Sequence, residues 1–176
     1  MTQKLTWVPA SERPDLLADS VRKAVENDPA LAAAEVTEID PVYADTAALV
    51  ENFDVTADQS ANCVVVTGKR GGESSWAACL VLASTRADVN GAVRKHLNVR
   101  KASFAPLAEV EAATGMEYGG ITPVGLPDTW PLLISEGVAA HPMVVIGSGL
   151  RRSKLRLPGS ALAASGSAIV LPDLAV

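Results

Sequence analysis

The strongest constraint on the fold is a pair of apolar runs separated by a glycine-containing segment. Residues 63–66 read Cys-Val-Val-Val, and a second apolar run spans residues 76–83. β-Branched residues favour strands, and Gly68, Gly71 and Gly72 lie between the two runs. This arrangement predicts a β-hairpin. Gly68-Lys69 is not part of a phosphate loop, because the first glycine of that motif is missing and a strand follows where a helix is needed.

Elements of both kinds surround this hairpin. Apolar spacing and capping residues predict helices at residues 14–27, 45–53, 88–97, 106–114 and 158–164, and strands at 35–42, 102–104, 130–135, 144–146, 155–157 and 167–171. The strands and helices do not alternate as regular βαβ units. The pattern therefore predicts an α+β fold with a mixed, partly barrel-like sheet surrounded by helices. A length of 176 residues predicts a single domain over residues 1–176.

The sequence lacks the residue patterns of several common catalytic and cofactor-binding sites. His96 and His141 have no metal-binding partner at helical or strand spacing, so we expect no metal and no cofactor. Gly147-Ser148-Gly149 lacks the third glycine of a dinucleotide fingerprint, and no G-x-S-x-G elbow is present. Cys63 and Cys79 lie in apolar runs, which predicts reduced, buried thiols of a cytoplasmic protein; a disulfide between neighbouring strands is the alternative.

Charge is distributed unevenly along the chain. The net charge is −5, yet residues 61–176 carry 11 Lys and Arg against 8 acidic residues. A basic region on an acidic protein permits a polyanionic partner. Its densest basic runs comprise Arg94, Lys95, Arg100 and Lys101 and then Arg151, Arg152 and Lys154. The alternative is an ordinary solvated helix face. No apolar run, including that at residues 77–83, is long enough to span a membrane.

Residues 119–125 read Gly-Gly-Ile-Thr-Pro-Val-Gly. Glycine allows a ligand to approach the main chain, and proline stiffens the loop. Such a loop can present free N–H groups to a carbonyl oxygen, a carboxylate or a phosphate. The alternative is a tight connection between a helix and a strand.

Residues 114–125 resemble the T-G-x-x-x-G-G-[IV]-[ST]-P-[FL]-G signature of the YbaK/prolyl-tRNA editing family. Residues 59–66 resemble its lysine-bearing strand, and residues 144–149, 154–157 and 161–162 resemble its closing strands and helix, so the similarity covers roughly residues 55–172. The resemblance implies a YbaK-like α+β domain that hydrolyses the ester of a mischarged aminoacyl-tRNA without a protein nucleophile. It implies an aminoacyl-tRNA partner, no DNA and no membrane, and leaves the oligomeric state open.

The resemblance also assigns site residues. The catalytic set is Asn62, Gly120 and Gly125. The substrate-binding set is Gly119, Ile121, Thr122, Pro123, Ser135, Gly147, Ser148 and Gly149. The two basic runs, Arg94, Lys95, Arg100, Lys101, Arg151, Arg152 and Lys154, are expected to contact tRNA.

Two departures from the family pattern matter. Asn62 stands where the family has lysine, and Ser135 stands where it has aspartate. Both differences remove charge from the expected pocket. They leave open a non-catalytic member that binds a tRNA end, a nucleotide or a protein partner. Asn62 itself either contacts the substrate or satisfies a main-chain group at the end of its strand.

Overall fold

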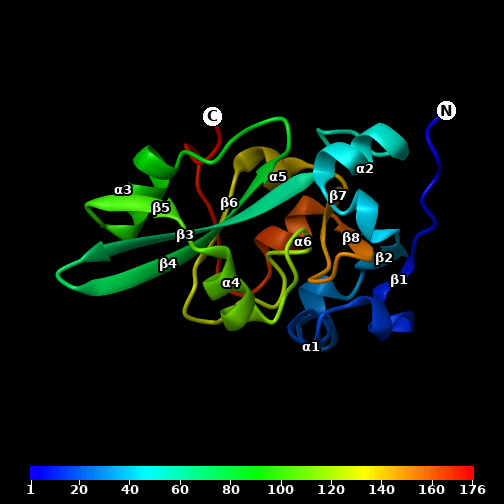
Figure 1. Ribbon diagram of the computed structural model, residues 1–176, viewed down its shortest axis with the longest axis horizontal. Coiled ribbons are helices and arrows are strands. Elements are labelled where there is room, and N and C mark those ends of the chain that lie inside the picture. The colour runs from blue at the N-terminus through cyan, green and yellow to red at the C-terminus, as the bar shows by residue number, and fades with distance from the viewer.

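A long hairpin dominates the computed structural model, which describes residues 1–176. Strands β3 (Ala61–Arg70) and β4 (Glu73–Leu82) pair antiparallel over their whole length and extend to one end of the molecule (Figure 1). Gly71 and Gly72 form the turn with φ of 59° and 85°. Two successive positive φ values match the twist of the flanking strands. The predicted hairpin is confirmed.

The hairpin belongs to a five-stranded sheet of order β5-β3-β4-β6-β9. Its other members are β5 (Lys101–Phe104), β6 (Leu132–Ile134) and β9 (Ala168–Val170). β3 pairs antiparallel with β4 and β5, whereas β6 pairs parallel with β4 and β9. The sheet is therefore mixed, as predicted.

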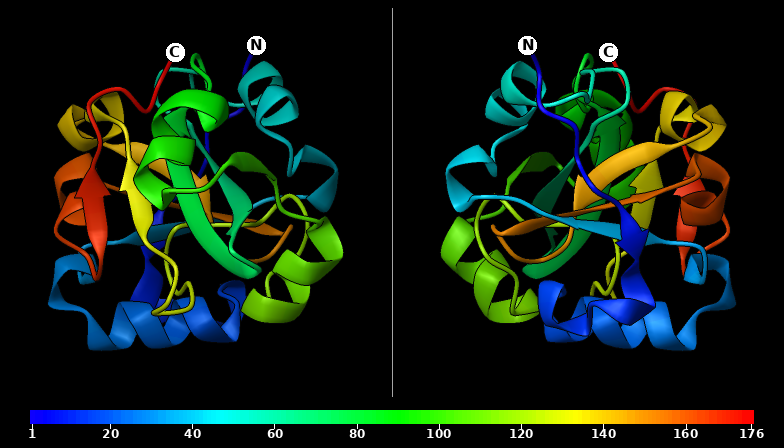
Figure 2. Two further views of the ribbon diagram at one scale, coloured as in Figure 1. Left: turned by 90° about the vertical axis from the view of Figure 1, so that its left-hand side faces the viewer. Right: turned by 90° about the vertical axis from the view of Figure 1, so that its right-hand side faces the viewer.

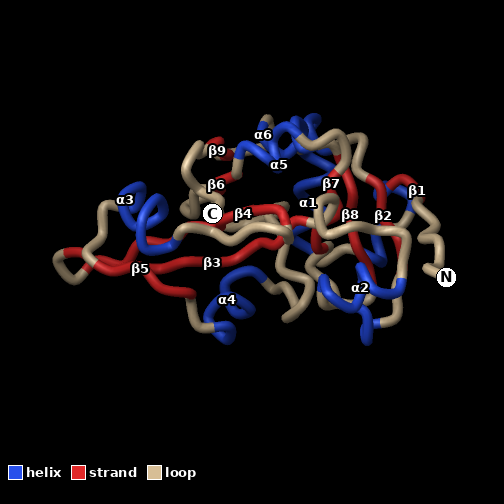
Figure 3. The backbone as a smooth tube through the Cα atoms, turned by 90° about the horizontal axis from the view of Figure 1, so that it is seen from above, coloured by secondary structure: helices blue, strands red, loops and turns tan.

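A second sheet of order β1-β2-β8-β7 is wholly antiparallel. Its strands are β1 (Val8–Pro9), β2 (Glu35–Glu38), β8 (Ser153–Leu157) and β7 (Val144–Gly147). The sheets meet where Ser60 bridges Val145, whose N–H donates to the Gln59 carbonyl at 2.7 Å. This junction brings the start of β3 beside β7 and β8, and Figure 3 shows the two groups of strands side by side.

Six α-helices lie on the outside of the strands (Figure 2). They are α1 (Asp19–Asn27), α2 (Thr46–Asn52), α3 (Arg94–Leu97), α4 (Leu107–Thr114), α5 (Glu136–Ala140) and α6 (Gly159–Ala163). Val21 and Val25 of α1 pack into the main apolar core together with Leu155 and Leu157 of β8. None of the helices combines the length and apolar character needed to cross a membrane.

Three predicted details are wrong. Val42 does not end a strand: it lies in a 3-10 turn over Pro41–Tyr43 and is 66% exposed, because Pro41 has no N–H to donate to a ladder. Ser135 lies beyond β6, where its hydroxyl accepts from the Val138 N–H and begins the unpredicted helix α5. The apolar spacing of the helix predicted at 106–114 places Leu107 and Val110 on its inward face, but Leu107 is 43% exposed and only Val110 is buried.

One aromatic pair joins the hairpin to the segment before β6. Trp76 of β4 stacks on Trp130 of the loop before β6, with ring centroids 5.1 Å apart and planes 8° apart.

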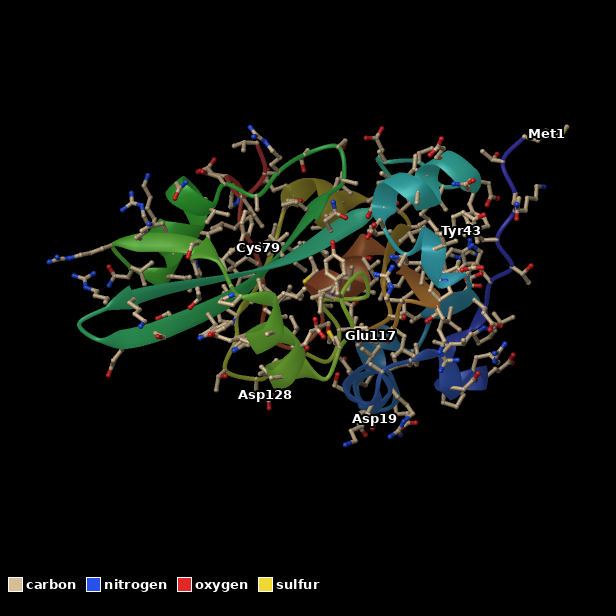
Figure 4. The ribbon with its side chains drawn as sticks, in the orientation of Figure 1. Met1, Asp19, Tyr43, Cys79, Glu117 and Asp128 are labelled. Carbon is tan, nitrogen blue, oxygen red and sulfur yellow. The ribbon has the colours of Figure 1, made fainter.

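Cys63 and Cys79 are free thiols, as predicted. Cys63 lies opposite Leu80, not opposite Cys79. Figure 4 labels Cys79 on the hairpin. Burial raises the pKa of Cys79 to about 12 and raises that of Cys63 further. Neither thiol has the character of an activated nucleophile.

Candidate functional site

A cavity of about 540 Å³ opens between β3 and the loop that follows α4. Its walls come from the segment that begins α2, the first half of β3, the β5–α4 junction, the glycine-containing loop, the end of β7, and Lys154 of β8. Most of the lining is apolar, including Val65, Val110 and Ile146. A mostly apolar cavity with a few converging polar groups is the usual form of a small-molecule site.

Lys154 places an amine in this cavity. β8 is an internal strand, paired with β2 on one edge and with β7 on the other. Lys154 is only 6% exposed. Its Nζ donates to the Ala44 carbonyl at 2.7 Å and to the Gly119 carbonyl at 3.4 Å. Burial lowers the pKa of Lys154 to about 8, with the nearby Asp45 carboxylate acting in the opposite direction and Arg151 in the same direction.

The start of β3 contributes two more polar side chains. The Asn62 side-chain carbonyl accepts a 2.8 Å hydrogen bond from the Thr46 hydroxyl, which leaves the Asn62 amide hydrogens available. Ser60 is one of the residues that line the cavity, and its hydroxyl is buried without any hydrogen-bond partner. Buried hydroxyls are normally paired, so this unpaired hydroxyl in the cavity wall is a candidate for a ligand contact.

Only part of the glycine-containing loop reaches the cavity. Gly119 and Ile121 line it, and their N–H groups donate to no main-chain carbonyl. Gly120 is buried and does not line the cavity; it packs against Leu150, whose backbone would lie 2.8 Å from an added Cβ. Residues 122–124 are buried, and Gly125 packs against the Ser20 carbonyl on the α1 side. The structure thus brings Asn62 to the cavity but places Gly120 and Gly125 outside its lining.

The remaining predicted substrate-binding residues separate in the same way. Gly147 lines the cavity. Ser148 is fully buried, and its hydroxyl lies 2.6 Å from the Ser153 hydroxyl. Gly149 packs against Ala18, and Ser135 caps α5 away from the cavity. Ser148, Gly149 and Ser135 therefore support neighbouring segments and line no part of the cavity.

The two basic runs do not form one surface. Arg94 and Arg100 border a groove at the hairpin tip together with Lys69 and Arg70, and Lys95 and Lys101 are exposed nearby. β8 lies toward the other end of the molecule (Figure 1). Arg152 is exposed there, and it donates to the Asp15 carbonyl at 2.6 Å. Lys154 was expected among outward-facing cations, but its burial places it in the cavity.

Arg151 makes hydrogen bonds to two segments at the rim of the cavity. Its guanidinium donates to the main-chain carbonyls of Tyr118 at 3.0 Å and Pro41 at 3.1 Å. The main-chain N–H of Arg151 donates to the Glu117 carboxylate. Figure 4 labels Glu117 near the centre of the molecule. The guanidinium also lies 5.8 Å from the Tyr118 ring centroid. Arg151 therefore joins the turn before α2 to the glycine-containing loop.

The rim carries exposed aromatic rings that the sequence analysis did not single out. Phe104 is 66% exposed and Tyr118 is 57% exposed, and both line the cavity. Exposed aromatic rings beside a polar cavity offer stacking surfaces to nucleobases. Phe104 ends the strand predicted at 102–104, and Tyr118 lies inside the signature at 114–125. Their positions beside these two segments are the sequence signal that could have identified them as site residues.

Comparisons with known proteins identify a matching family model and solved structures of similar fold. Residues 40–164 match the family model of the aminoacyl-tRNA editing domain. A crystal structure described as a candidate trans-editing enzyme for prolyl-tRNA synthetase superposes with a TM-score of 0.75 at 23% identity, covering 89% of this chain and 96% of the other. A hypothetical protein of solved structure gives a TM-score of 0.76 at 18% identity, covering 90% and 100%. A scaffold used for computational epitope grafting gives 0.72 at 23%, covering 88% and 96%. Among curated proteins, none matches the chain.

Proposed function

Because this chain belongs to the aminoacyl-tRNA editing domain family, we propose that it is a deacylase that hydrolyses the ester bond of a mischarged aminoacyl-tRNA. We take residues 1–176 as one editing domain that works in the cytoplasm on tRNA made available by a synthetase. The observation that carries the proposal is the cavity between β3 and the loop after α4, where free loop N–H groups and polar side chains meet an apolar pocket.

The chemistry requires water, an ester and a place for negative charge. The water oxygen attacks the ester carbonyl carbon, and the carbonyl π electrons move to its oxygen. The carbon–oxygen bond to the ribose then breaks, and the ribose oxygen takes up a proton, so that a free amino acid and an uncharged tRNA end result. Hydrogen-bond donors fixed near the developing oxyanion are each worth on the order of 3 kcal/mol. The N–H groups of Gly119 and Ile121 have no main-chain partner and suit this role.

The cavity and its rim suit the two halves of the substrate. The apolar wall formed by Val65, Val110 and Ile146 suits a small amino-acid side chain. Phe104 and Tyr118 suit the terminal base of the acceptor end, since bases stack on exposed aromatic rings. These assignments predict that a short aminoacylated acceptor end is already a substrate.

The test is a deacylation screen. Purified protein is incubated with a panel of tRNAs carrying correct and incorrect amino acids, and loss of the ester is followed against the spontaneous rate in buffer. We expect accelerated loss from one class of mischarged tRNA and none from its correctly charged counterpart. Binding of the same tRNA without accelerated loss would establish the non-catalytic alternative, in which the domain binds a tRNA end. If the protein neither binds nor hydrolyses any tRNA of the panel, the deacylase proposal and the non-catalytic alternative are both overturned.

A further inference from the structure

Lys154 is a buried cation without an anionic partner. Its Nζ is held by two main-chain carbonyls, those of Ala44 and Gly119, and it forms no ion pair. An ammonium carries three N–H donors, so these carbonyls leave one. Lys154 lines the cavity beside the glycine-containing loop. The third N–H of its ammonium is therefore available to an acceptor atom of a molecule bound in the cavity.

The cost of this arrangement indicates a role beyond folding. Burying a charge without a counter-charge is unfavourable, and such groups gather at functional sites. Its neighbour Arg156, also on β8, shows the usual alternative: its guanidinium forms a 3.0 Å ion pair with Glu35 and lies 4.5 Å from the Trp7 ring centroid. Lys154 has no comparable partner, although a carboxylate, Asp45, also lines the cavity.

We propose that Lys154 is a catalytic residue of this cavity, whose ammonium donates its remaining N–H to the carbonyl oxygen of the bound aminoacyl ester. The inference rests on the proposed deacylase function and adds a side-chain cation to it. As water attacks the carbonyl carbon, the electron pair that moves to the carbonyl oxygen comes to lie beside the ammonium. Lys154 keeps its proton throughout. The attacking water loses one proton, and the departing ribose oxygen gains one.

The position of the cation also explains how the site accommodates Asn62. β3 and β8 approach the cavity from different sheets, and both Asn62 and Lys154 line it. A neutral amide at the start of β3 is therefore compatible with a charged site, because β8 supplies the charge. The sequence predicts loss of charge at positions 62 and 135, and Lys154 adds to the cavity a positive charge that this prediction did not include.

The test compares Lys154→Met with Lys4→Met, which removes an exposed cation near the N-terminus. Deacylation is measured under single-turnover conditions at saturating protein, so that weakened tRNA binding does not contribute. We expect Lys154→Met to lose about 100-fold or more in rate, the usual effect of removing one oxyanion donor, and Lys4→Met to keep the wild-type rate. A thermal melt of each variant verifies folding. A folded Lys154→Met protein with the wild-type rate would overturn the inference and leave the deacylase function standing.

The pH profile separates an ammonium donor from an amine base. The charged or titratable groups around Lys154 are Asp45, Arg151, Cys63 and Tyr118. We expect the ratio of catalysed to spontaneous hydrolysis to fall as the pH rises through about 8, where Lys154 loses its proton, and to change little with pH in Lys154→Met. A ratio that rises through this range would overturn the ammonium role.

A second readout does not depend on turnover. An aminoacyl-adenosine amide, in which an amide replaces the ester, retains the carbonyl oxygen and is not hydrolysed. Lys154→Met should weaken its binding roughly tenfold at pH 7, since one hydrogen bond from a charged group is lost. If the protein hydrolyses no ester, the proposed function fails, and this binding measurement alone decides the Lys154 contact. Equal binding by wild type and Lys154→Met would overturn that contact.

Discussion

The Thr46 hydroxyl donates a 2.8 Å hydrogen bond to the side-chain carbonyl of Asn62. This bond orients the amide and leaves its N–H hydrogens for a substrate atom. We expect Asn62→Ala to lower kcat/KM for deacylation by roughly tenfold, as loss of one hydrogen bond predicts. Thr46→Val removes the orienting bond but keeps the amide, and should have a smaller effect. Equal losses in both variants would mean that Asn62 acts only by holding α2 against β3.

Ser60 and Thr122 both have a buried hydroxyl without a hydrogen-bond partner, so substitutions at these two residues serve as test and control. Ser60 belongs to the wall of the cavity, whereas Thr122 does not line it. Removing an unpaired buried hydroxyl is neutral or stabilising, so Ser60→Ala and Thr122→Val should both keep or raise the Tm. Only Ser60→Ala should weaken binding of the amide analogue. Unchanged affinity in Ser60→Ala would exclude a ligand contact at this hydroxyl.

Gly120 is required for close packing. An added Cβ would lie 2.8 Å from three backbone atoms of Leu150, and backbone cannot move aside as a flexible side chain can. We therefore expect Gly120→Ala to lower the free energy of unfolding by about 1–3 kcal/mol. The sequence predicts Gly120 as a residue that leaves room for a ligand, whereas the structure gives it a packing role against Leu150.

The matched control for Gly120→Ala is Gly137→Ala in helix α5. There the nearest atom to an added Cβ is the end of the flexible Leu82 side chain, at 3.2 Å. Urea denaturation of both variants measures the difference. A Gly120→Ala protein as stable as wild type would show that the Leu150 segment shifts freely.

The groove at the hairpin tip predicts the salt dependence of tRNA binding. Arg94 and Arg100 border it, and each phosphate contact contributes about 0.7–0.9 to the slope of log affinity against log salt concentration. The double variant Arg94→Ala/Arg100→Ala should make that slope shallower by about 1.4–1.8, with Lys4→Ala as the control. An unchanged slope would place tRNA elsewhere on the molecule.

The lowered pKa of Lys154 predicts how stability depends on pH. Between about pH 8 and 10.5, the folded protein holds this residue neutral while the unfolded chain still binds the proton. The unfolded state therefore binds more protons, and the contribution of Lys154 to the free energy of unfolding rises with pH across this window. Its unfavourable effect is complete below about pH 8 and amounts to on the order of 3 kcal/mol.

The measurement is the difference in unfolding free energy between wild type and Lys154→Met at pH 7 and at pH 10. The subtraction removes the effect of the two free thiols, Cys63 and Cys79, whose raised pKa values lower the stability of both proteins in alkali. Wild type should gain relative to the variant as the pH rises. A constant difference would show that Lys154 titrates like a solvated lysine.

Local patterns in the sequence predict much of the fold. The hairpin follows from two apolar runs around glycines, and α4 stops at Gly115, whose φ is 69°, as its position after the apolar spacing indicates. The two-residue strand β1 and the five-residue helix α5 were missed, because such short elements depend on tertiary contacts. β1 exists only through its pairing with β2.

The candidate site was harder to predict, because neighbouring residues in the chain have different surroundings. Arg151, Arg152 and Lys154 read as one basic cluster. Lys154 occupies a strand flanked on both sides, whereas Arg152 precedes that strand and is exposed. The alternation of Leu155 and Leu157 with Lys154 and Arg156 indicates a strand, but only the topology shows that this strand is internal.

The stacked pair of Trp76 and Trp130 gives the protein an internal spectroscopic reporter. The rings belong to the hairpin and to the segment leading into β6, so their coupling persists only while these two parts remain docked. The third tryptophan, Trp7, lies against Arg156 in the other sheet and contributes a separate signal. Near-ultraviolet circular dichroism of wild type and Trp7→Phe can therefore follow loosening of the hairpin separately from loosening of the second sheet, without any added label.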